Sequence, residues 1–225
     1  MMKTSSSPSS SSARVPVLRR VAGAAISGYR RRLLSIGTAV LVAAGLPACT
    51  QEKPAFKLTD LSGADYGNEL SLTNAATGKP VTLQDLKGKV VFLFFGFAQC
   101  PDICPTTLLK AREIKEQLGK DADRLQVVFV TLDPERDTPE VLQAYVPSFD
   151  ESFMALRGDD KATKKAAREF RVFYQKVPNQ DGSSYTLDHT AASYVIDRNG
   201  TLRLLVRYTD NVDDVVHDLK LLLKA

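Results

Sequence analysis

Apolar runs alternate with amphipathic stretches along most of the chain after residue 69, and this alternation predicts a layered α/β fold. The clearest run is Val90–Phe95, a β-branched and aromatic segment between two glycines, which predicts a strand buried on both faces. Ahead of it, Glu69–Thr73 and Lys79–Thr82 alternate around a turn and predict a β-hairpin. After it, strands are expected at Leu125–Leu132, Phe153–Leu156, Ser193–Ile196 and Leu202–Arg207, and helices at Thr106–Leu118, Pro139–Val146, Asp160–Phe170 and Val212–Leu223. This order is typical of a thioredoxin-like fold, in which helices flank a mixed central sheet.

The first 48 residues differ from the rest and predict a signal peptide. They carry basic residues and no acidic ones, and they end in Leu33–Leu46, an uncharged apolar run too short to span a bilayer, which takes about 20 residues. Leu46–Cys49 resembles the lipobox of bacterial lipoproteins, where the chain is cut before a cysteine that receives lipid. We therefore expect a lipid anchor on Cys49, a tether over residues 49–60 and one domain over 61–225.

This interpretation places the domain on the periplasmic side of a bacterial cytoplasmic membrane. The arginines before Leu33 loosely resemble a twin-arginine export signal, so export by that route or by the general secretory route is left open. The net charge of +4 comes from the leader, because the rest of the chain has more acidic than basic residues. No basic surface is left to neutralise phosphates, so we expect no nucleic-acid partner.

Cys100 and Cys104 stand between a buried strand and a helix, and they are the two cysteines left once Cys49 is lipidated. A helix N-terminus favours negative charge, so both are expected to ionise more readily than a free cysteine. The spacing of four brings the side chains together on one helical turn. It suits a structural disulfide, a redox pair in which Cys100 attacks and Cys104 resolves, or a shared metal ion.

The chain has two histidines, and they differ in setting. His217 lies within the last predicted helix and needs no functional explanation. His189 lies in the loop before strand Ser193–Ile196, which in a thioredoxin-like layout faces the start of the cysteine-bearing helix. That loop lacks the proline of redox thioredoxins, since no proline follows residue 179. Two thiolates and an imidazole suit copper, and thiolates select Cu(I), whereas zinc would want a fourth ligand.

Acidic residues near these ligands are candidates to orient the imidazole by accepting a hydrogen bond from the ring nitrogen that does not bind the metal. Asp133 and Asp188 are the two that we name for this role, with Asp137 beside them. Turn and helix-cap duty is the alternative for all three acids, and it is favoured for Asp133 and Asp137, each of which is close to a proline.

The whole pattern resembles the SCO/SenC family, copper proteins associated with assembly of cytochrome c oxidase. The matching stretches are Leu86–Gly96, Cys100–Pro105, Asp133–Pro139, Phe173-Tyr174 and Asp188-His189, in the family's order and approximate spacing. The resemblance implies that Cys100, Cys104 and His189 bind one copper ion, Cu(I) or Cu(II), per chain.

The resemblance also implies a copper chaperone that receives copper from a periplasmic donor. It would deliver copper to the CuA centre of oxidase subunit II, or to another cuproprotein, and reduction of the recipient's cysteines is a second role. Two other classes stay open: a thiol–disulfide oxidoreductase or peroxiredoxin-like enzyme using the cysteines alone, and redox sensing coupled to gene regulation.

Overall fold

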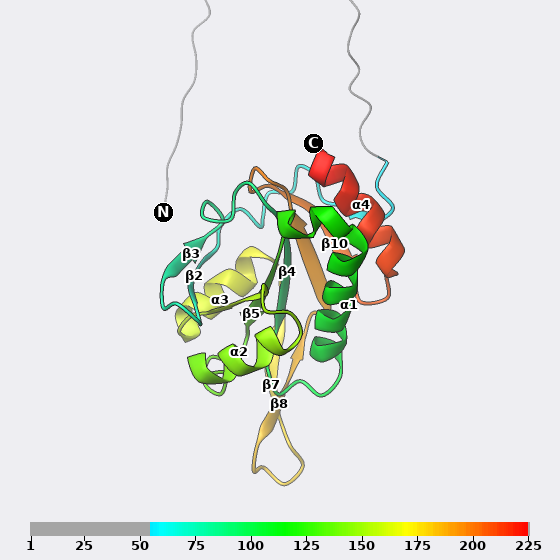
Figure 1. Cartoon of the computed structure of the whole chain (residues 1–225). Helices are drawn as coiled ribbons and strands as arrows, with labels where there is room; N and C mark the ends of the chain where they lie inside the picture. The colour runs from blue at the N-terminus through cyan, green and yellow to red at the C-terminus, as the bar shows by residue number, and fades with distance from the viewer. Residues whose placement is uncertain (1–54, 225) are drawn as a thin grey trace, which may run out of the picture. The chain divides into compact units, whose positions relative to one another are not determined.

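An eight-stranded mixed sheet runs through the part of the chain that the computed structural model describes, residues 55–224 (Figure 1). Its strand order is β1-β10-β9-β4-β5-β6-β2-β3. The strands are β1 (Thr59–Asp60), β2 (Ser71–Asn74), β3 (Pro80–Thr82), β4 (Val90–Gly96), β5 (Leu125–Thr131), β6 (Met154–Arg157), β9 (Ala192–Ile196) and β10 (Leu202–Arg207). The β4–β5 and β5–β6 pairs are parallel and the other neighbours are antiparallel. The expected thioredoxin-like sheet and its N-terminal hairpin, β2–β3, are confirmed.

Strand β4 forms the centre of the sheet because it has nothing polar to present to water. All of its residues are buried, and it pairs with β5 along one edge and β9 along the other. Burying apolar side chains on both faces is the behaviour predicted for its unbroken apolar run. The strand therefore gives a rigid base for the loop that follows Gly96.

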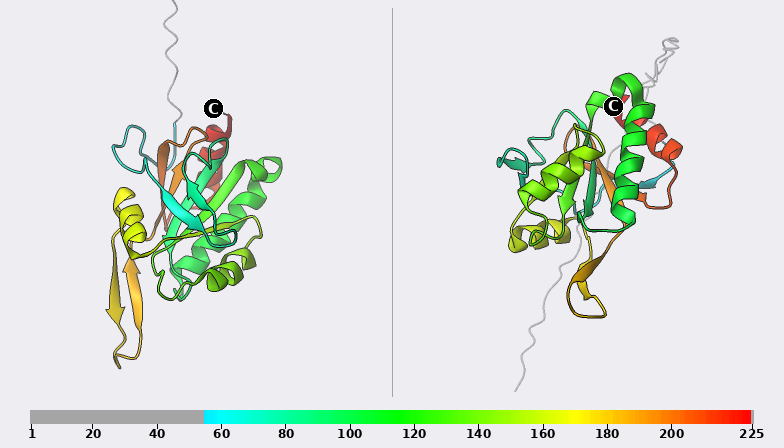
Figure 2. Two further views of the ribbon diagram at one scale, coloured as in Figure 1. Left: turned by 90° about the vertical axis from the view of Figure 1, so that its left-hand side faces the viewer. Right: turned by 60° about the horizontal axis from the view of Figure 1, so that its bottom comes forward.

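Helices cover both faces of this sheet (Figure 2, left). Helices α1 (Ile103–Leu118), α2 (Pro139–Tyr145) and α4 (Val212–Lys224) lie on one face, and α3 (Asp160–Glu169) lies on the other. Short 3-10 turns at Gly119–Arg124 and Val146–Ser148 follow α1 and α2. The apolar side of α4 is buried, as its periodicity predicts.

Helix α1 begins at Ile103, three residues before the start expected from the sequence. The earlier start places Pro105 in the first turn of the helix. A proline is tolerated in the first turn, where its missing N–H would have no partner within the helix. Cys104 consequently lies inside the helix rather than in the loop before it.

A second hairpin, not predicted from the sequence, projects from the body of the domain (Figures 1 and 2). Its strands are β7 (Tyr174–Pro178) and β8 (Tyr185–His189), which form a separate two-stranded antiparallel sheet. His189 is the last residue of β8, so it lies at the end of a strand and not in the loop that the sequence analysis expected.

The domain also begins earlier than expected. Residues 57–60 were expected to be tether, but β1 pairs with β10 at one edge of the sheet. The buried carboxylate of Asp218 on α4 accepts hydrogen bonds from the N–H groups of Lys57 and Leu58. The predicted signal peptide, the lipobox and Cys49 lie outside the described residues.

Candidate metal centre

Cys100 lies in the short connection between β4 and α1. The N–H of Cys100 donates to the carbonyl of Phe97 over 3.2 Å, which turns the chain back on itself ahead of the helix. Its side chain is half-buried. The Cys104 N–H donates to the Cys100 sulfur over 3.4 Å, so an N–H of the first helical turn that lacks a partner within the helix points at this thiol.

Cys104 is fully buried in the first turn of α1, and a glycine makes room for it. A Cβ at Gly96 would come within 2.8 Å of the Cys104 sulfur, 2.9 Å of Phe94 and 3.0 Å of Phe129. Gly96 therefore shapes the seat of the buried ligand. The sequence shows this glycine at the end of a strand but gives no sign of the sulfur above it.

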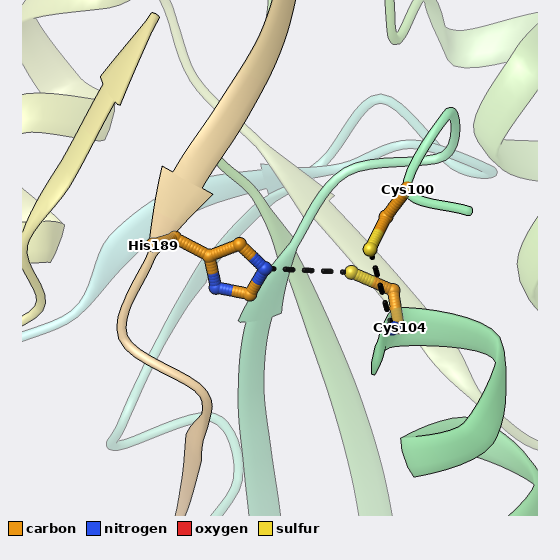
Figure 3. A group of neighbouring side chains, drawn as sticks. All are labelled: Cys100, Cys104 and His189. Carbon is orange, nitrogen blue, oxygen red and sulfur yellow. Dashed lines mark hydrogen bonds between the residues drawn. The ribbon is translucent and has the colours of Figure 1, made fainter. Parts of the chain in front are cut away.

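His189 reaches the cysteines from β8 (Figure 3). Its Nε2 lies 3.6 Å from the Cys104 sulfur, and the rings of Phe94 and Phe97 meet the imidazole edge-on. Its Nδ1 lies 3.0 Å from the backbone carbonyl of Thr190, so Nδ1 carries the hydrogen and donates it. Nε2 then faces the sulfur atoms with its lone pair available for a metal.

The three side chains predicted as ligands are thus brought together. One ligand atom from each of Cys100, Cys104 and His189 lies within 4.8 Å of the others. Three atoms bound to one ion at about 2.0–2.3 Å lie about 3.5–4.0 Å apart in a trigonal arrangement. Movements of about 1 Å or less therefore close the group around an ion.

The two thiols share one negative charge unequally in the absence of metal. A hydrogen bond from the Cys104 thiol, helped by the backbone N–H groups of Asp102 and Cys104, lowers the pKa of Cys100 to about 4. The same thiol pairing, together with burial, raises the pKa of Cys104. The expectation that both cysteines ionise readily is therefore wrong for Cys104, because it is the donor to Cys100 and is shielded from water. Both are free thiols.

Neither carboxylate named to orient the imidazole contacts it. Asp133 accepts hydrogen bonds from Arg136 Nε and, over 2.8 Å, from the Tyr185 hydroxyl. Asp188 is exposed. The carbonyl of Thr190 takes the place expected of an acid, and no sequence pattern distinguishes one backbone carbonyl from another.

Asp137 supports the cysteine-bearing loop instead. It is fully buried, and its Oδ2 accepts hydrogen bonds from the Ala98 N–H over 3.0 Å and from the Thr131 hydroxyl over 2.6 Å. Thr131 ends β5 opposite Gly96 of β4, so this carboxylate ties the loop to the ends of both central strands. Burial raises its pKa.

The other histidine lies on α4, as expected. His217 is partly exposed, and its Nδ1 lies 2.8 Å from Asp218 Oδ1. Among residues 55–224, no helix has the length and apolar character needed to cross a bilayer.

Comparison with known proteins gives one consistent match. The SCO1/SenC family model matches residues 59–224. An SCO2-like protein of Rickettsia felis is 37% identical over 171 residues, which cover 75% of this chain and 82% of the relative. The structure of Bradyrhizobium japonicum ScoI with copper bound has 39% identity and a TM-score of 0.64, covering 70% of this chain and 99% of that one. The solution structure of apo Sco1 from Thermus thermophilus has 42% identity and a TM-score of 0.66, covering 74% and 96%.

Proposed function

The chain belongs to the SCO1/SenC family, and from that premise we propose that it is a copper chaperone for the CuA centre of cytochrome c oxidase subunit II. It binds one copper ion through Cys100, Cys104 and His189. The observation that carries this proposal is the convergence of two sulfurs and a correctly oriented imidazole nitrogen on one point between α1 and β8. The copper-bound ScoI structure supports the identity of the metal.

The ligand set suits an ion that is carried and then released. Thiolates select Cu(I), and imidazole also accepts Cu(II). In the described part of the chain the cluster contains three ligand residues, and Cys100 is half-buried. A thiol or imidazole of a recipient can therefore reach the ion from the Cys100 side and replace the ligands of this chain one at a time.

The same thiols support a second role, reduction of a disulfide in the recipient before copper is loaded. The thiolate of Cys100 would attack one recipient sulfur, forming a mixed disulfide and releasing the other sulfur as a thiolate. Cys104 would then lose its proton and attack Cys100, freeing the second recipient thiol. The recipient gains two electrons and this chain becomes a Cys100–Cys104 disulfide. The low pKa of Cys100 favours the first step.

The proposed location is the outer face of a bacterial cytoplasmic membrane, with Cys49 lipidated and a periplasmic donor supplying copper. The support is the leader composition and the lipobox-like Leu46–Cys49. Mass spectrometry of the protein isolated from membranes tests this: a mature chain that starts at lipidated Cys49 is expected, and an unmodified Cys49 would contradict it.

Transfer to a recipient tests the chaperone function directly. The copper-loaded chain is mixed with the metal-free soluble domain of an oxidase subunit II, and formation of the CuA absorption is followed with a strong copper chelator present. Direct hand-over predicts that CuA forms despite the chelator. Capture of all the copper by the chelator, with no CuA formed, would refute delivery.

A further inference from the structure

The outer edge of β7 carries main-chain hydrogen-bonding groups that point away from its partner strand. In an antiparallel pair, directly opposed residues alternate between those that exchange backbone hydrogen bonds and those that do not. The Thr190 N–H donates to Phe173 O, and the Asn179 N–H donates to Ser184 O. These two bonds fix the alternation along the whole hairpin.

By this alternation, Gln175 and Val177 direct their N–H and C=O groups toward β8, whereas Tyr174 and Lys176 direct theirs outward. The opposite edge agrees, because Tyr185, which faces Pro178, points its carbonyl outward and receives a hydrogen bond from Arg136. Within residues 55–224, no backbone hydrogen bond is made by Tyr174 or Lys176 toward any other element.

A groove follows this open edge, between β7 and helix α3. Two hollows that share Asp160, Tyr174 and Lys176 run along it. Lys164 and Arg168 of α3 line one of the hollows, and so does Phe173, the residue just before β7. An open strand edge facing a helix across a groove is the arrangement that receives an added peptide strand, as PDZ domains do.

The side chains around the groove define what fits into it. Lys164 pairs with Asp160, and Lys176 pairs with Glu135, so these charges are balanced. Arg168 has no ion pair within the described residues and offers a site for one acidic side chain. Phe173 is 61% exposed, which is unusual for a phenylalanine and offers an apolar contact.

We propose that this groove binds an extended segment of the copper recipient by β-strand addition to the outer edge of β7. The identity of the recipient rests on the proposed function. The segment carries an acidic residue for Arg168 and an apolar residue for Phe173. Because Tyr174 is directly opposite His189, the added strand lies two strand spacings, about 10 Å, from the His189 backbone. Docking here therefore holds the recipient beside the copper site.

Amide hydrogen exchange at single-residue resolution tests the proposal on the full chain in detergent, alone and with the subunit II soluble domain. The amides of Tyr174 and Lys176 are expected to exchange freely in the chain alone and to slow by about tenfold or more in the complex. Gln175 and Val177 are internal controls, since their amides are already bonded to β8 and should be slow in both states.

A matched pair of variants tests the same edge by binding. Lys176→Pro removes an outward N–H and leaves the β7–β8 bonds in place, while Lys176→Ala removes the same side chain and keeps the N–H. Lys176→Pro is expected to weaken binding of the subunit II domain about tenfold relative to Lys176→Ala, with the copper affinity of both variants unchanged.

Four outcomes would overturn the proposal. If the complex forms but the amides of Tyr174 and Lys176 are not protected, the docking edge is refuted and the chaperone function stands. The same conclusion follows if Lys176→Pro and Lys176→Ala bind the subunit II domain with equal affinity. Protection of the edge in the chain alone shows that a second copy of the chain occupies it. Failure of the wild-type chain to bind the subunit II domain refutes the proposed function and this inference together.

Discussion

Gly96→Ala is the substitution that most sharply tests how the buried ligand Cys104 is positioned. The added methyl group would lie 2.8 Å from the Cys104 sulfur, with Phe94 and Phe129 at 2.9 and 3.0 Å on its other sides. All three neighbours are buried, so none can swing into solvent. The methyl group can be accommodated only by moving α1 and its cysteine outward or by displacing the aromatic rings.

The size of the effect follows from these distances. Ordinary contact with a Cβ begins at about 3.4 Å, so the sulfur must retreat by roughly 0.6 Å in an interior that is already close-packed. Overpacking of this kind costs about 1–3 kcal/mol of folding stability. We expect the Cu(I) affinity to fall at least about tenfold, because one of three ligands is moved out of reach.

The assay is Cu(I) competition against a colorimetric chelator, beside thermal unfolding of the metal-free chain. Gly158→Ala is the matched control, since its methyl group would also meet side chains at 2.7 and 2.9 Å, from Ala162 and Leu72, but away from the cysteines. Both variants should be destabilised and only Gly96→Ala should lose affinity. Wild-type affinity in Gly96→Ala would refute the placement of Cys104.

Three further predictions concern groups around the site and the start of the domain. In the metal-free chain, iodoacetamide should alkylate Cys100 with a rate midpoint near pH 4, because the thiolate is the reactive form, and it should leave Cys104 unmodified. Equal reaction of both cysteines would contradict the unequal ionisation of the two thiols. Asp137→Ala should lower the free energy of unfolding by about 2–4 kcal/mol, measured in urea, because two buried donors lose their acceptor, and Asp137→Asn should cost less. Asp218→Ala should cost a similar amount and speed amide exchange over residues 57–60, whereas unchanged exchange there would show that the carboxylate does not hold this segment.

Much of the fold could be predicted because its central elements have one-sided or fully apolar patterns. Val90–Phe95 could only be a strand buried on both faces, and it became β4. The hairpin β7–β8 was missed because it projects from the body and buries little, so no apolar run marks it. Its sequence did carry a weak sign: Asp181-Gly182 stands between Tyr174–Pro178 and Tyr185–His189, each of which begins with a tyrosine and contains one β-branched residue.

The candidate site likewise has a part that the sequence predicts and a part that only the structure shows. Residue types predicted Cys100, Cys104 and His189 as a group, and the structure brings them together. What surrounds them depends on contacts between distant segments: the Thr190 carbonyl behind the imidazole, Gly96 beneath the sulfur and the Asp137 anchor on the loop. The unequal pKa values of the two thiols also arise from burial, which the spacing of the cysteines does not reveal.

The central claim is that copper is held by two cysteines and one particular histidine. Because the chain has two histidines, His217→Ala is a matched control for His189→Ala. The decisive measurement is Cu(I) affinity together with the thiolate-to-Cu(II) charge-transfer absorption of the two variants. His189→Ala is expected to lose about 100-fold or more in affinity and to change the absorption, while His217→Ala matches wild type. Identical behaviour of the two variants would show that His189 is not a ligand.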